Sequence, residues 1–104
     1  MNDLPSAKSS LLTALEINSQ SSTAALRLFD VATQLNDRET GKFALDTVLR
    51  VDPQNLMANI NRGLLAVASG DIDLAKRCLE KAEKIDPTNQ GVNALRTRVR
   101  SFRK

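Results

Sequence analysis

The sequence predicts an all-α fold, a solenoid of repeated helical hairpins with about six antiparallel helices. A shift of 34 residues places Asp52-Pro53 on Asp86-Pro87 and aligns Leu11 with Leu45 and Leu79. Apolar or small residues recur at helical spacing, with one series at positions 72, 75, 79, 82 and 85. Alternation of polar and apolar residues, the pattern of a half-buried strand, never persists.

The first three helices are expected at residues 4–18, 22–35 and 38–51. Asp3, Ser21 and Asp37 each directly precede one of them, and such short polar side chains accept hydrogen bonds from the first free N–H groups. Turn chemistry at Asn36 separates the second helix from the third. The third ends at Asp52-Pro53, because a residue before proline avoids the helical region.

The next three helices are expected at residues 56–69, 72–85 and 90–102, where the same signals return. Asn55, Asp71 and Asn89 are the expected N-caps. Gly70 supplies the turn inside the pair, and Asp86-Pro87 ends the fifth helix. The loops are only a few residues long, as antiparallel neighbours require.

Composition argues against catalysis. The 104 residues suit one domain and contain no His and a single Cys. Pairs of Ser or Cys with His are therefore excluded, as is a His/Cys metal site. We expect no catalytic, cofactor-binding or metal-binding residue, and hence no enzyme. No apolar run could span a membrane and no signal peptide is visible, so a cytoplasmic location is favoured; a periplasmic protein or a longer chain stays open.

Residues Leu56–Asn89 carry the strongest motif. Counted from Leu56, the eighth, twentieth, twenty-fourth, twenty-seventh and thirty-second residues are Gly63, Ala75, Leu79, Ala82 and Pro87. This pattern resembles the tetratricopeptide repeat family. The resemblance implies one domain over residues 1–104, made of a half-repeat at 4–18, repeats at 22–55 and 56–89, and a basic cap helix at 90–102. It also implies right-handed superhelical curvature and a non-catalytic adaptor that binds proteins.

In this family a concave groove, lined by the first helix of each pair, holds the partner. The resemblance places here Leu26, Arg27, Asp30, Met57, Ile60, Asn61, Leu64, Val67, Ala94, Leu95 and Arg98. Only Asn61 fits the family's clamp for a C-terminal carboxylate, so that mode of binding is rejected. The remaining apolar strip suits a helix or extended segment of another protein. Alternatively, the terminal helix or an oligomer partner covers the strip.

Two further surfaces give competing hypotheses. The stripe Ala7, Leu11, Ala14 and Ile17 would normally pack on a preceding helix, which favours a homodimer or a self-associating segment of a secretion, pilus or envelope assembly protein. The net charge of +3 divides into −2 for residues 1–95 and +5 for the last nine. Arg96, Arg100 and Arg103 on one side of the last helix could meet nucleic acid or an anionic surface. The absence of interleaved aromatics other than Phe102 disfavours nucleic acid; a solvated cap is the plainer interpretation.

Overall fold

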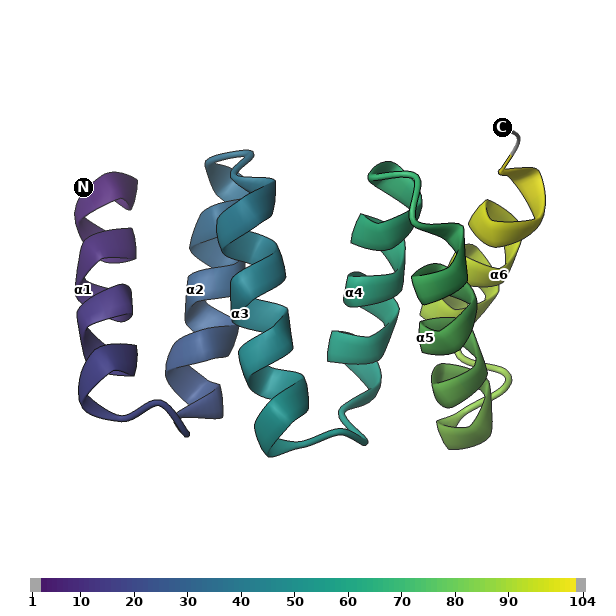
Figure 1. Cartoon of the computed structure of the whole chain (residues 1–104), viewed down its shortest axis with the longest axis horizontal. Coiled ribbons are helices and arrows are strands. Elements are labelled where there is room, and N and C mark those ends of the chain that lie inside the picture. Colours follow the sequence, from purple (N-terminus) through teal and green to yellow (C-terminus); the bar gives the residue numbers. More distant parts are fainter. Residues whose placement is uncertain (1–2, 103–104) are drawn as a thin grey trace. The chain divides into compact units, whose positions relative to one another are not determined.

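The computed structural model describes residues 3–102 and confirms the all-α fold (Figure 1). All six predicted helices are present and begin at the predicted residues, and none ends more than one residue from its predicted end. Within the described range there is no strand. The helices are α1 (Leu4–Ile17), α2 (Ser22–Gln34), α3 (Arg38–Val51), α4 (Leu56–Ala68), α5 (Ile72–Ile85) and α6 (Gln90–Ser101).

The predicted capping residues set these helix starts. The side chain of each accepts a hydrogen bond from a backbone N–H of the first turn, which satisfies a group that has no partner inside the helix. At the equivalent turns before α3 and α5, Asn36 and Gly70 adopt positive φ angles of 55° and 82°. The six caps are Asp3, Ser21, Asp37, Asn55, Asp71 and Asn89.

The chain forms two compact units, Met1–Pro53 and Gln54–Lys104, and the division lies beside the predicted border between repeats. In unit 1, α2 packs on both α1 and α3. In unit 2, α4, α5 and α6 all pack on one another. The single domain and its superhelical curvature stay predictions.

The core of unit 2 joins all three of its helices. Ile60, Leu79, Ala82, Val92 and Leu95 form a buried cluster. Two glycines bring α4 and α6 close together. A Cβ atom at Gly63 would lie 2.7 Å from Leu95 Cδ2, and one at Gly91 would lie 2.9 Å from Ile60 Cδ1. Both distances are too short for real atoms, so the bare backbones let this packing form.

Candidate functional site

The predicted groove residues of unit 1 lie on the open side of α2. Leu26 is 37% exposed, although it is a large apolar side chain. Arg27 and Asp30, one and four residues further on, are also exposed. Unit 1 therefore presents one exposed apolar side chain and charges of both signs on the same helix.

In unit 2 the predicted groove needs a correction. Ile60 is only 2% exposed and Leu95 is fully buried, so neither can form a binding surface. Ile60 packs against Gly91 of α6, and Leu95 packs against Gly63 of α4. At Ile60 the terminal helix thus covers the strip, which is the alternative that the sequence left open, but this cover does not extend to every member.

Other members of the unit 2 set remain accessible. Met57 is 56% exposed, and Asn61 and Leu64 are partly exposed on the same side of α4. Ala94 and Arg98, one turn apart, are exposed on α6. These five residues, Met57, Asn61, Leu64, Ala94 and Arg98, are called the α4/α6 surface below. Val67, like Leu64, is partly buried and packs against the core cluster.

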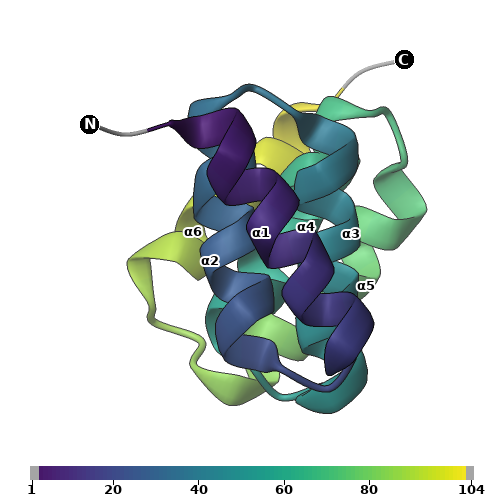
Figure 2. The ribbon, with the colours of Figure 1, turned by 90° about the vertical axis from the view of Figure 1, so that its left-hand side faces the viewer.

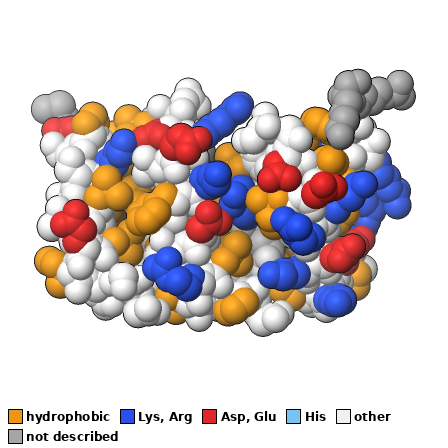
Figure 3. Space-filling view, viewed as in Figure 1, with side chains coloured by type: hydrophobic (Ala, Val, Ile, Leu, Met, Phe, Trp, Pro, Cys, Tyr) orange, Lys and Arg blue, Asp and Glu red, His pale blue; other side chains and the backbone are white. Residues whose placement is uncertain are grey.

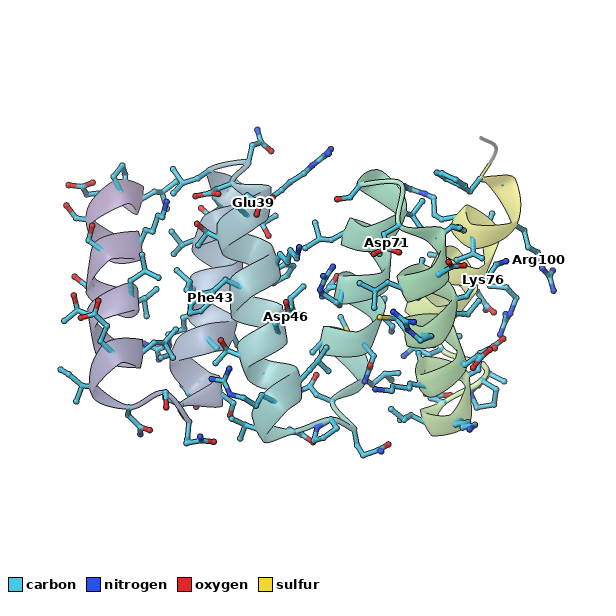
Figure 4. All side chains as sticks on the ribbon, viewed as in Figure 1. Glu39, Phe43, Asp46, Asp71, Lys76 and Arg100 are labelled. Carbon is cyan, nitrogen blue, oxygen red and sulfur yellow. The ribbon has the colours of Figure 1, made fainter. Side chains whose placement is uncertain are left out.

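The basic stripe predicted on the last helix is not a continuous open patch. Arg96 donates from Nε to Glu83 Oε2 at 2.9 Å, and its guanidinium also reaches the Pro87 carbonyl and Asn93. This side chain therefore joins α6 to α5 and is not free to meet phosphates. Arg100 is exposed and points away from α6 (Figure 4). Arg103 lies outside the described residues.

The predicted end surface on α1 is half covered. Ala7, Leu11 and Ala14 are each partly buried. The residues 34 positions later, Gly41, Leu45 and Val48, are buried, as are Ala75, Leu79 and Ala82 in the next copy. The same stripe is thus less covered in α1 than in α3 or α5.

One exposed apolar residue, Phe43, was missed by the sequence-based site predictions, whereas Ile17 belongs to the stripe predicted on α1. Ile17, at the end of α1, is 84% exposed, and Phe43 on α3 is 47% exposed. Phe43 stands out from α3 where hydrophobic side chains gather on one face of unit 1 (Figures 3 and 4). The exposure of Phe43 could have been read from the sequence, because this position lies outside the buried stripe and the next repeat has Arg77 there.

Catalytic groups do not gather in the described part of the chain. Residues 3–102 hold no cluster of His, Cys, Asp and Glu that could bind a metal ion. Cys78 is buried beside the core. None of the described helices has the length and apolar character needed to cross a membrane.

Equivalent hairpins spaced 34 residues apart, with small residues where helices meet, define a helical-hairpin repeat protein. Residues 58–89 match the family model described as a tetratricopeptide repeat, which confirms the resemblance for this segment. This segment is therefore similar to a tetratricopeptide repeat, a module that in general mediates protein–protein interaction and is generally non-catalytic. No curated protein matches the chain significantly.

Proposed function

We propose that this chain is a non-catalytic adaptor whose α4/α6 surface binds a helix or extended segment of another protein. The observation that carries the proposal is the exposure of Met57, 56%, on a helix whose adjacent Ile60 is locked in the core. An apolar side chain displayed on a rigid packed base suits recognition of an apolar partner face. Methionine adds adaptability, because its unbranched side chain can follow the shape of the partner.

Polar groups of the α4/α6 surface give the bound segment its orientation. Asn61 offers both a donor and an acceptor, and Arg98 offers a fork of donors. On α2, Leu26, Arg27 and Asp30 occupy the repeat positions of Ile60, Asn61 and Leu64. They remain the predicted groove residues of unit 1 and are not part of the α4/α6 surface.

Affinity capture with Met57→Glu tests this function. Met57 is exposed, so the substitution leaves the fold intact but places a charge in the apolar contact, and we expect captured partner to fall at least tenfold. The matched control is Phe43→Glu, which introduces the same charge at an exposed apolar residue of unit 1 that belongs to no predicted site. The captured protein is then purified and its affinity measured against both variants. Equal binding by Met57→Glu and the native chain would refute the α4/α6 surface as the site.

Self-association through α1 is a second candidate function. Figure 2 looks onto a face of α1 that no other described helix covers. Ala14 of α1 is only partly buried, whereas Val48 of α3 and Ala82 of α5, which occupy the same repeat position, are buried. A helix from a second copy would cover Ala14.

Sedimentation equilibrium distinguishes the two candidates. A self-associating chain shows a rising mass up to high micromolar concentration, and Ser10→Glu with Ile17→Glu returns it to a monomer. Both side chains are exposed, so the charges disturb the contact rather than the fold. A native chain that stays monomeric throughout this range excludes the second candidate.

A further inference from the structure

We propose that the segment bound by the α4/α6 surface is an acidic amphipathic helix of a partner protein. This inference rests on the proposed function and names the chemistry of its partner. It follows from how charge is distributed among the three helices of unit 2.

Carboxylates are confined to one helix of unit 2 and its ends. Neither α4 nor α6 contains Asp or Glu. On α5 the two signs are mixed, as the face toward the viewer shows in Figure 3. The acidic residues of unit 2 are Asp71, Asp73, Glu80, Glu83 and Asp86, all in α5 or at its two capping positions.

Among the cations of α4 and α6, Arg98 is the one at the α4/α6 surface. Arg62 is buried, at 8% exposed. Arg96 is held by Glu83 at 2.8 Å. Arg100 is two residues from Arg98, which turns it about 200° around the helix and away from this surface. Arg98 is exposed and forms no ion pair among the described residues.

An exposed arginine beside apolar side chains selects its partner by charge. A carboxylate of a bound helix can accept two parallel hydrogen bonds from the guanidinium, whereas a lysine there is repelled. Arg98 follows Ala94 by one turn, so the acidic group lies about one turn beyond the apolar contact. Exposed ion pairs contribute modestly, so charge tunes the affinity while apolar burial supplies most of it.

The experiment uses three synthetic helical peptides with one leucine stripe, flanked by Glu, by Gln or by Lys. Each is titrated into the full ¹⁵N-labelled chain at low salt, and amide shifts give both affinity and location. We expect the Glu peptide to perturb α4 and α6 and to bind about 3- to 5-fold more tightly than the Gln peptide, with the Lys peptide weakest. The preference should shrink at 0.5 M salt because ions screen exposed charges.

Arg98→Gln and Arg100→Gln form the matched pair, since both remove one exposed arginine from the same helix. The preference for Glu should disappear in Arg98→Gln and persist in Arg100→Gln. If both variants lose the preference for Glu equally, the inference is overturned, because the effect would then come from the overall positive charge of α6 and not from Arg98. Equal affinity of the Glu and Gln peptides at α4 and α6 also overturns it but leaves the proposed function standing. If no peptide perturbs the amide shifts of α4 and α6, both the inference and the proposed function fail. Both also fail if a second copy of the chain, and no peptide, perturbs these shifts.

Discussion

Asp37 has two structural roles in unit 1. Its carboxylate caps α3 by accepting from the Thr40 backbone N–H at 3.1 Å and from the Thr40 hydroxyl at 2.7 Å. It also accepts from Lys8 Nζ at 2.6 Å, which ties α1 to the start of α3. The hydrogen bond from Lys8, followed by those from Thr40, lowers the pKa of Asp37 from 3.8 to about 2.

The lowered pKa of Asp37 predicts that the free energy of unfolding decreases at acidic pH. A carboxyl group whose pKa is lower in the folded state stabilises the fold above its unfolded pKa of 3.8, and this contribution is lost as the pH falls through about 2. Urea unfolding of the native chain and of Lys8→Met should therefore differ at pH 5–7. The two curves should converge between pH 4 and pH 2. A difference that stays constant down to pH 2 would show that Lys8 acts by packing alone.

Gly70 lies where the backbone needs a left-handed conformation. Its φ is 82° and no atom lies within 4 Å of where a Cβ would stand, so only backbone strain opposes a side chain. Gly70→Ala should cost about 1–2 kcal/mol of unfolding free energy. Gly70→Asn should cost less, because Asn36 adopts a φ of 55° at the equivalent turn. Urea denaturation measures both, and an Asn variant as unstable as the Ala variant would contradict this explanation.

At the scale of elements, α4 has one face packed on α6 and another exposed to solvent. Ile60 lies on the packed face and Met57 on the exposed one. Ile60→Ala should lower the unfolding free energy by about 2–5 kcal/mol, because it leaves a cavity against α6. Met57→Ala, three residues earlier, should change it by at most about 0.5 kcal/mol, because that side chain is exposed. Urea unfolding followed by circular dichroism compares the two. Equal losses would mean that Met57 is also covered in solution.

The elements themselves were predictable because their signals are local. A cap such as Asp71 and a stop such as Asp86-Pro87 act within a few residues, so each helix start could be read directly. The burial of Ile60 could not be predicted in this way, because it depends on packing against α6, which begins 30 residues later in the chain. The sequence does contain a glycine at each contact between α4 and α6, Gly63 and Gly91. Residue spacing alone does not say which side chain packs against each glycine.

The same limit explains the correction at the basic end. Helical spacing places Arg96 and Arg100 near one another on α6, and this part of the prediction needs only the helix. The partner of Arg96 is Glu83 on α5, 13 residues away, and the pairing depends on how two helices pack. Part of the positive charge at the basic end thus holds α6 to α5 within unit 2.

For the molecule as a whole, charge follows the two compact units. Residues 1–53 carry five basic and seven acidic side chains, and residues 54–104 carry ten and five. Residues 54–95 carry five basic and five acidic side chains, so the positive excess of unit 2 lies in its last nine residues. Three of the five cations in this stretch, Arg96, Arg98 and Arg100, belong to α6, one of the two helices of the proposed site.

Stability should also be uneven along the chain. In α1, Leu15 is the buried side chain, and the helix packs on α2. The other terminal helix, α6, buries Val92 and Leu95 completely and packs on both α4 and α5. Helices that bury less apolar surface open at lower free energy, so α1 should exchange its amide hydrogens fastest among the described helices.

Native-state hydrogen exchange followed by NMR tests this gradient. The free energy of opening should be lower for the amides of α1 than for those of α6. Lys8→Met should lower it further in α1, since the tie to Asp37 is lost, and should leave α6 unchanged. Protection of α1 equal to that of α6 at low protein concentration would contradict the expected order. Protection that rises only in α1 as concentration increases would mean that a second copy covers this helix, as the self-associating candidate requires.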